Sequence, residues 1–281
     1  MKLRGDVLKK IRRKRGLSQT ALAEGICTQA TISLMEKQNR LPKMNILTAI
    51  CERLNIPTER IVENNGNGIN DQFNTIVNDL ISGNLDSAED ALNKIPVKKL
   101  ESDFDKQRYY YLLGMVQVNS DKIDEAIFNF ELVLTQFATT SANIYLAMTT
   151  AGMALAYYKR NDPERAQRLT DRAVRLIDNK KLIGSLHQWA SIYCQLGELY
   201  TNLGNYKESK DIVGRGIELC RQHDSLFILD ELYFILGKDE LALGEEEEAK
   251  QSLEIAKSIS LARYSSSVKD KIAAELAKLD D

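Results

Sequence analysis

The side chains best suited to contact the edges of base pairs are concentrated in one short segment, as Gln29, Ala30, Thr31 and Ser33. Thr28 is a good N-cap for a helix that we expect over residues 28–36, and such a helix presents these side chains together at its first turns. A glutamine amide can bond adenine at two positions, and the methyl groups of alanine and threonine can contact the methyl group of thymine. The segment therefore predicts a helix that enters the major groove of DNA with its N-terminus first.

Neighbouring positions suit contacts with phosphates. Gln19 would begin a short helix capped by Ser18, and the amides at helix N-termini favour phosphate oxygens. We expect further DNA contacts from the helix cap, Thr28. Three cations outside the first turns should also contact the DNA: Arg13, Lys37 and Arg40. The alternative interpretation is that these polar residues form an ordinary solvated helix face.

Charge is divided unevenly along the chain. Residues 1–63 carry 13 Lys and Arg against 6 Asp and Glu, a net charge of +7, although the whole chain of 281 residues has a net charge of −2. The remaining residues therefore have a net charge of −9. A basic head on an acidic body favours nucleic acid as the partner of the head alone.

The elements that must position these residues are helices. Apolar residues recur at helical spacing from Leu3 to Ile11, Gly16 ends that pattern, and Gly25 marks the turn before Thr28. A fourth helix follows Pro42, and we expect a short fifth one after Pro57. The segment LSQTALAEGICTQATISLMEKQNRLPKMNILTAICERLNI resembles the helix-turn-helix domain of phage-repressor (XRE) type, over about the first 63 residues.

Beyond a polar stretch at 64–70, which we expect to be a linker, the sequence repeats. Five segments are typical of a helix, a turn and a second helix, with a small residue aligned in the second helix of each: Ala88, Ala126, Ala166, Ser209 and Ala249. Their spacing of 38 to 43 residues is somewhat longer than the roughly 34 of a tetratricopeptide unit. We predict an all-α chain, with a five-helix helix-turn-helix domain at 1–63 and, at 71–281, a right-handed superhelix of about five tetratricopeptide-like pairs and a C-terminal capping helix.

The first helix of each pair should form the inner wall of the superhelix. Amides on this wall suit the backbone of an extended peptide, and apolar pockets between them suit its side chains. Ordinary packing between helices is the alternative for any single residue. The candidate peptide-binding residues are Arg108, Tyr111, Met115, Asn119, Met148, Gly152, Tyr158, Lys159, Gln195, Glu198, Asn202, Glu231, Phe234 and Lys238.

Both parts together resemble the PlcR and Rgg group of peptide-responsive (quorum-sensing) transcription regulators over nearly the whole chain. The resemblance implies a homodimer that binds an inverted-repeat operator on double-stranded DNA and is controlled by a short secreted peptide that re-enters the cell. It also implies that a side-chain amide on an inner helix clamps the peptide backbone. Gln195 is the matching position, in place of an asparagine, and Asn202 lies two turns further along.

Other functions have less support. There is no glycine-rich phosphate loop, nucleophile elbow or His/Glu metal motif, so we expect neither an enzyme nor a cofactor or metal site. The four cysteines have no CxxC spacing and are interpreted as small buried side chains. No apolar run could span a bilayer, which predicts a cytoplasmic protein without a membrane partner. The remaining alternative is a DNA-binding regulator whose repeats hold a protein partner.

Overall fold

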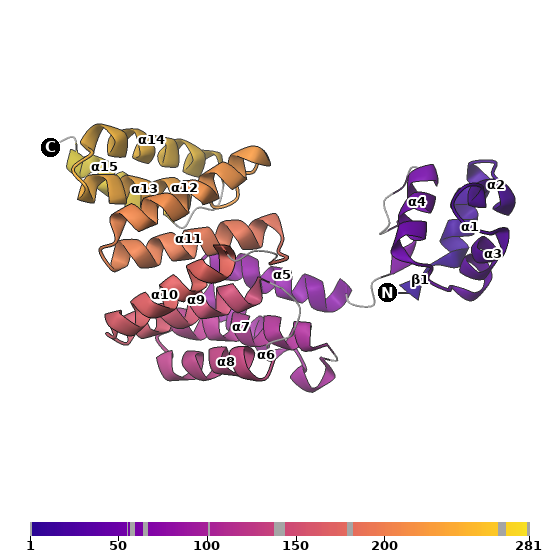
Figure 1. Cartoon of the computed structure of the whole chain (residues 1–281), viewed down its shortest axis with the longest axis horizontal. Coiled ribbons are helices and arrows are strands. Elements are labelled where there is room, and N and C mark those ends of the chain that lie inside the picture. Colours follow the sequence, from indigo (N-terminus) through magenta and orange to yellow (C-terminus); the bar gives the residue numbers. More distant parts are fainter. Residues whose placement is uncertain are drawn as a thin grey trace. The chain divides into compact units, whose positions relative to one another are not determined.

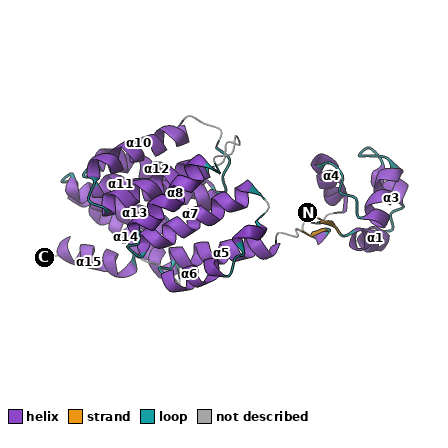
Figure 2. Cartoon of the chain, turned by 90° about the horizontal axis from the view of Figure 1, so that it is seen from below, coloured by secondary structure: helices purple, strands orange, loops and turns teal. Residues whose placement is uncertain are grey.

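The computed structural model describes residues 2–54, 56, 60–63, 67–100, 102–137, 144–178, 182–263 and 268–279. They divide into two compact units, one ending at Gln72 and the other beginning at Phe73. The described chain is almost wholly helical (Figure 1 and Figure 2), which confirms the predicted fold class.

The described part of the first unit contains four complete helices and a small sheet. α1 spans Gly5–Lys14, α2 Gln19–Ala23, α3 Gln29–Gln38 and α4 Met44–Leu54. β1 (Lys2–Leu3) pairs antiparallel with β2 (Val62–Glu63), so that Leu3 lies opposite Val62. The apolar spacing predicts Leu3 in the first helix and does not predict this sheet, because strands of two residues have no periodicity to detect. The helix expected after Pro57 falls largely on residues outside the described part.

Local signals set the turns on either side of α2. Gly16 and Gly25 have φ angles of 70° and 71°, in the left-handed region that glycine enters without steric cost. Ser18 Oγ accepts a hydrogen bond from the amide of Ala21 at 3.0 Å. Thr28 Oγ1 accepts one from the amide of Thr31 at 3.3 Å. Both N-caps were predicted, and they fix where α2 and α3 begin.

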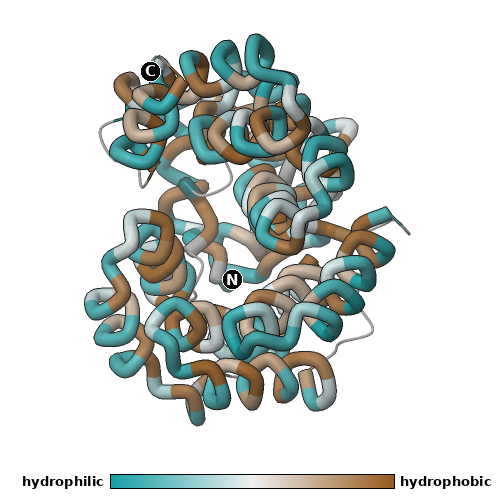
Figure 3. Tube along the Cα trace, turned by 90° about the vertical axis from the view of Figure 1, so that its left-hand side faces the viewer, coloured by the Kyte–Doolittle hydropathy of each residue, from teal (hydrophilic) through white to brown (hydrophobic). Residues whose placement is uncertain are grey.

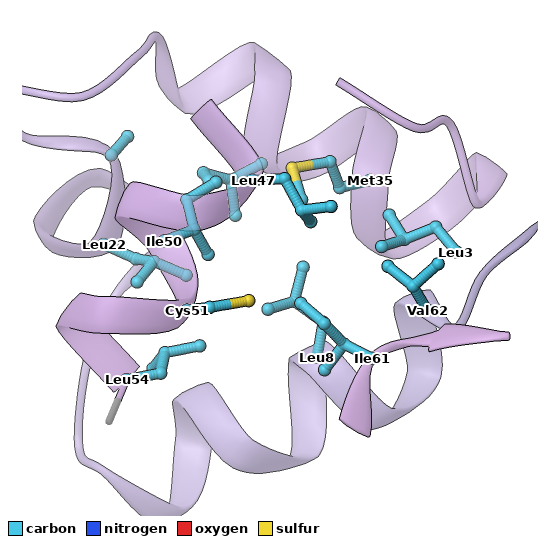
Figure 4. Close-up of a cluster of buried hydrophobic side chains, with 12 residues drawn as sticks. Leu3, Leu8, Leu22, Met35, Leu47, Ile50, Cys51, Leu54, Ile61 and Val62 are labelled. Atoms are coloured by element: carbon cyan, nitrogen blue, oxygen red, sulfur yellow. The ribbon is translucent and has the colours of Figure 1, made fainter. Parts of the chain in front are cut away.

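One apolar core joins the four helices and the sheet (Figure 4). Leu8, Leu22 and Met35 are at most 1% exposed, and they come from α1, α2 and α3. Leu47, Ile50 and Leu54 close the core from α4. Each fully buried side chain of this size stabilises the fold by about 1.5–3 kcal/mol. This core therefore holds α3 at a fixed position on α1 and α2.

The connection between the units differs from the prediction. α5 spans Asn67–Ile81, so residues 67–70 are helical, although their Asn and Gly content predicted a linker over 64–70. Ile69, Phe73 and Ile76 recur at helical spacing, and Phe73 and Ile76 are fully buried. This apolar stripe outweighs the poor helix propensity of the preceding residues. Residues 64–66 lie outside the described part.

The second unit consists of paired helices, as predicted. α5 is followed by α6 (Leu85–Asn93), and Ser87 of α6 donates a hydrogen bond to Asp79 of α5 at 2.8 Å. A 3-10 turn at Val97–Lys99 leads to the next pair. The other pairs are α7 (Asp103–Asn119) with α8 (Ile123–Thr135), α9 (Tyr145–Lys159) with α10 (Pro163–Asp178), α11 (Leu186–Asn202) with α12 (Tyr206–Gln222), and α13 (Leu229–Ala242) with α14 (Glu246–Ala262). α15 (Lys269–Leu279) packs on α14 as the expected last helix.

Small residues allow the helices of a pair to approach closely. Each of the five aligned small residues is fully buried: Ala88, Ala126, Ala166, Ser209 and Ala249. A Cβ atom added to Gly197 of α11 would lie 2.3 Å from Val213 of α12, and one added to Gly237 would lie 2.8 Å from Leu253. The first helices also contact one another in succession, α7 with α9, α9 with α11 and α11 with α13. These contacts place them side by side along one wall.

Figure 3 shows hydrophobic and hydrophilic residues interleaved along the helices, as expected when one stripe of each is buried. None of the described helices has both the length and the apolar character needed to cross a membrane. Cys51, Cys194 and Cys220 are buried, and Cys27 is half-buried. Within the described residues, no three His, Cys, Asp or Glu side chains gather as a metal site would require.

Candidate functional site

The first turn of α3 is open to solvent. Gln29 and Ala30 are exposed, whereas Thr31 and Ser33 are half-buried. The hydroxyl of Thr31 lies 3.0 Å from that of its cap, Thr28. The predicted base-reading residues therefore share one helical end, with Gln29 and Ala30 the most accessible of them.

A chain of hydrogen bonds orients the amide of Gln29. Gln29 Nε2 donates to Gln19 Oε1 at 2.7 Å, and Gln19 Nε2 donates to Glu36 Oε2 at 2.8 Å. Arg12 in turn donates to both carboxylate oxygens of Glu36, from Nε at 2.5 Å and from Nη2 at 2.9 Å. The sequence predicts a phosphate contact for Gln19, and this stays a prediction. In the structure the Gln19 side chain links the exposed Gln29 to a buried ion pair.

Hydrogen bonds offset the cost of burying the ion pair between Arg12 and Glu36. Arg12 and Glu36 are each 7% exposed, and Arg12 Nη1 also donates to the carbonyl of Leu17 at 2.7 Å. Burial alone would raise the pKa of Glu36, but the hydrogen bonds from Arg12 and Gln19 reverse this and hold it below its ordinary value. Glu36 therefore stays ionised near neutral pH and keeps Gln19 in place.

The predicted phosphate-binding cations lie on the surface. Arg13 is in the last turn of α1 and Lys37 in the last turn of α3, and both are exposed, as is Arg40 just beyond α3. Asn39 lies between Lys37 and Arg40 and ends α3 with a left-handed φ of 54°. Its side-chain oxygen accepts a hydrogen bond from the amide of Gly5 at 2.9 Å. Asn39 therefore fixes the turn after α3.

The second unit has a cavity of about 220 Å³ on the wall formed by the first helices. Among the described residues, its lining comes from α5, α7, α9, α11 and α13 and from Ile228, which precedes α13. The lining residues are Val77, Leu80, Ile81, Tyr111, Leu112, Met115, Asn119, Met148, Leu155, Ser191, Cys194, Gln195, Glu198, Ile228 and Glu231.

Half of the predicted peptide-binding residues lie in this cavity, namely Tyr111, Met115, Asn119, Met148, Gln195, Glu198 and Glu231. Gln195 Nε2 lies 3.8 Å from Met115 Sδ, a weak acceptor, so its amide stands close to a wall of the cavity. Asn119 Nδ2 donates to the carbonyl of Met115 at 2.9 Å. Gln195 is thus the better placed of the two amides to meet a ligand.

The other predicted residues do not line the cavity. Arg108 donates to Asn74 at 2.8 Å and stacks on the ring of Phe73, and Lys159 donates to the carbonyl of Val118 and to Asp121. Tyr158 is half-buried and Asn202 is exposed near the ends of their helices.

Packing between helices accounts for three more of the predicted peptide-binding residues. Gly152 lies where α9 approaches Phe130 and Met115, and an added Cβ atom would be 2.7 Å from the Phe130 ring. Phe234 belongs to the core that α13 forms with α14 and α15, and Lys238 lies over its ring. For these residues, contacts between helices explain the residue type.

Several lining residues were missed by the sequence analysis. Val77, Leu80 and Ile81 belong to α5, whose segment has only a weak repeat pattern. Their apolar spacing within IVNDLI was the available signal. Ile228 is unusual, because it combines a left-handed φ of 45° with a β-branched side chain that is 3% exposed. Such a conformation costs about 1–3 kcal/mol, so the cavity borders a strained start of α13.

Comparisons with known proteins agree with this division. Residues 8–61 match the model of the helix-turn-helix family. Residues 107–138 and 190–223 match the model of the tetratricopeptide repeat. The first unit is therefore a helix-turn-helix domain, and the second contains tetratricopeptide repeats. A comparison of the sequence with curated proteins finds no match.

Solved structures share the fold over nearly the whole chain. Bacillus thuringiensis PlcR, in complex with the peptide PapR7 and DNA, has a TM-score of 0.72 at 19% identity, with 99% of each chain covered. ComR from S. thermophilus, in complex with DNA and its signalling peptide ComS, has a TM-score of 0.62 at 14% identity, again with 99% of each chain covered. The SHP pheromone receptor Rgg2 of Streptococcus dysgalactiae has a TM-score of 0.62 at 13% identity, with 98% of this chain and 99% of that chain covered.

Proposed function

We propose that this protein is a sequence-specific DNA-binding transcription regulator, that it acts as a homodimer, and that a short signalling peptide bound by its repeats controls it. α3 supports the first part, because its exposed first turn carries an oriented glutamine beside a methyl-bearing residue. One such helix reads only a few base pairs, so two copies on an inverted-repeat operator supply the specificity.

The observation that carries the peptide proposal is the cavity itself. It is mainly apolar, and it offers the Gln195 amide among the side chains of Leu80, Met148 and Leu155. Its volume of about 220 Å³ is below the roughly 300–1,000 Å³ usual for a whole small ligand. It therefore fits one or two side chains of a peptide whose backbone continues along the wall. PlcR and ComR, which share the fold, were solved with peptides bound.

The test is native mass spectrometry of the full-length protein, purified gently from the cells that naturally make it, at high cell density. We expect a dimer with an additional peptide-sized mass that can be sequenced. Leu155→Trp, which would fill the cavity, should remove that mass. Leu261→Trp is the control, because Leu261 is 64% exposed on α14.

Two results would contradict the proposal. Peptide retained by the Leu155→Trp variant would place the binding site elsewhere. A co-purified protein, found without any peptide, would favour the alternative in which the repeats hold a protein partner.

A further inference from the structure

The outer face of α8, the second helix of its pair, has an acidic stripe with an aromatic side chain in it. Asp124, Phe128 and Glu131 follow one another at spacings of four and three residues, so they lie along one face of the helix. All three are exposed, and Phe128 is 60% exposed. Ala126 and Phe130 face the other way and are fully buried. An aromatic ring this exposed is a candidate contact for a partner.

The outer face of α10, the second helix of the next pair, has a basic stripe. Its arginines recur at spacings of three and four residues and are all exposed: Arg165, Arg168, Arg172 and Arg175. α10 contains no lysine. Arginine is enriched at protein interfaces, because its planar guanidinium can hold a carboxylate by two parallel hydrogen bonds. The composition of this stripe therefore favours a protein surface as its partner.

The two stripes match each other in spacing. Asp124 and Glu131 are seven residues apart, and so are Arg165 and Arg172, which is about 10.5 Å along a helix. The aligned small residues of α8 and α10 are 40 residues apart, and the same offset relates Phe128 to Arg168. Both helices pack against α9. An acidic and a basic stripe of equal spacing thus occupy equivalent positions on neighbouring repeats.

Much of the charge on these stripes has no opposite charge beside it in the described part of the chain. Asp124 pairs with Arg160 at 3.3 Å, and Arg168 lies 3.8 Å from Glu164. The carboxylate of Glu131 and the guanidinium of Arg172 contact no opposite charge among the described residues. These two exposed groups are therefore available to pair with another molecule.

We propose that this outer face binds the same face of a second copy of the chain. A twofold axis between the stripes lays α8 of each protomer on α10 of the other. Glu131 then pairs with the partner's Arg172, and the ring of Phe128 packs on the guanidinium of the partner's Arg168. This inference rests on the proposed function, because it specifies the surface through which the homodimer forms.

Charge complementarity favours a second copy over other partners. A twofold contact uses the same patch on both protomers, so the patch must be complementary to itself. An acidic stripe beside a basic stripe of equal spacing meets that requirement. DNA or an acidic protein would match α10 but would be repelled by the carboxylates of α8.

Sedimentation velocity over a concentration series of the full-length protein measures the dissociation constant of the dimer. Glu131→Arg and Arg172→Glu each bring like charges together at both symmetric contacts. Each should therefore raise the constant at least about tenfold. Glu254→Arg on α14 and Arg221→Glu on α12 are the matched controls, because both residues are exposed and lie outside the stripes. They should leave the constant unchanged, and circular dichroism verifies that every variant is folded.

A mixture of the two weakened variants separates specific pairing from a general effect of charge. In a heterodimer of Glu131→Arg and Arg172→Glu chains, opposite charges meet at both contacts. Dimers should therefore reappear, with a dissociation constant close to that of the wild type. Isotopic labelling of one variant and native mass spectrometry show whether these dimers contain one chain of each kind.

The aromatic contact has its own variant. Phe128→Ala should raise the dissociation constant at least about tenfold, because the ring is buried only in the dimer. Leu261→Ala is the control, since Leu261 is 64% exposed on α14, outside the stripes. It should dimerise as the wild type does.

Three results would overturn the proposal in different ways. If the wild type is a dimer and the charge variants match it, or if their mixture forms no heterodimer, the interface lies elsewhere and the proposed homodimer stands. If the wild type is a monomer throughout the series, this surface and the homodimer are both wrong. A monomer that binds poly-glutamate, and loses this binding through Arg172→Glu, would assign α10 to an acidic partner instead.

Discussion

The amide of Gln29 is positioned before DNA binds. Gln19 accepts its hydrogen bond, Glu36 fixes Gln19, and Arg12 fixes Glu36 from inside the core. Ordering a glutamine side chain on binding costs free energy, about 0.5–1.5 kcal/mol for a side chain of this kind, and much of that cost is already met here. In the proposed role of Gln29 as a base-reading residue, the buried ion pair would contribute to recognition through this exposed side chain.

Replacing Gln29 with Ala should weaken binding to the operator by about 1–3 kcal/mol and leave binding to random DNA unchanged, because only the specific complex uses the amide. Gln38→Ala is the control, since Gln38 is an exposed glutamine at the other end of the same helix. Fluorescence anisotropy on both duplexes measures the difference. An equal loss on both would show that Gln29 does not read a base.

Sequence reasoning recovered the positions on α3 but not the bonds between side chains. Thr28 and Gln29 follow from cap chemistry and helical spacing, which are local. The role of Gln19 depends on Glu36, 17 residues away, and on an ion pair with Arg12 that only the folded core forms. From the sequence alone, a polar side chain at the start of a helix is equally compatible with a phosphate contact and with a hydrogen bond to another side chain.

Two glycines differ in how closely a neighbouring helix approaches them, so substitution by alanine should have opposite effects on stability at the two positions. Gly197→Ala should destabilise the second unit by about 1–3 kcal/mol, because its Cβ atom would lie 2.3 Å from the stiff side chain of Val213. Gly214→Ala, in α12, should stabilise it by about 0.8–1 kcal/mol, because no atom outside its own stretch of helix lies within 4 Å of the added Cβ atom and alanine favours a helix. Urea unfolding of the full-length protein measures both. A loss of stability in both variants would contradict the packing argument.

Asp239 joins three helices through a buried carboxylate. It is 0% exposed on α13 and accepts a hydrogen bond from Thr201 of α11 at 2.7 Å, and Thr201 in turn contacts Ser209 of α12. Burial raises the pKa of Asp239 from 3.8 to about 6, although the hydroxyl groups of Ser209 and Thr201 partly oppose this. The folded state therefore holds the proton more tightly than the unfolded state.

The stability that this proton contributes is present below the unfolded pKa and is lost as the pH rises through the folded pKa. Relative to an Asp239→Asn variant, the wild type should lose about 2.5 kcal/mol between about pH 4 and about pH 7.5. The comparison across pH removes any constant effect of the substitution on packing. Urea unfolding at the two pH values measures it, and parallel curves for the two proteins would contradict the buried-acid explanation.

Repeat spacing predicted the helix pairs, but it did not show which face of each helix is covered. The small residues mark the close contact within a pair, and all five are buried as expected. Phe234 and Glu231 lie three residues apart on α13 and were both assigned to the inner wall. Only Glu231 lines the cavity, because α14 and α15 cover Phe234. The contribution of α5 was missed because its pair has the weakest repeat pattern.

At the scale of the whole molecule, charge separates the two tasks. The net charge of +7 on residues 1–63 attracts DNA, and the net charge of −9 on the rest does not. The basic charge therefore favours contact with DNA through the first unit alone.

The proposed homodimer makes a prediction about DNA geometry. Two α3 helices related by twofold symmetry must meet the major groove on matching faces of the duplex. Inserting about five base pairs, half a helical turn, between the operator half-sites should therefore reduce binding toward the level of a single half-site. Inserting about ten returns the half-sites to the same face and should restore part of the affinity, limited by the reach of the dimer. Gel-shift titrations on the three duplexes and on an isolated half-site measure this, and affinity that does not depend on spacing would indicate that each chain binds DNA independently.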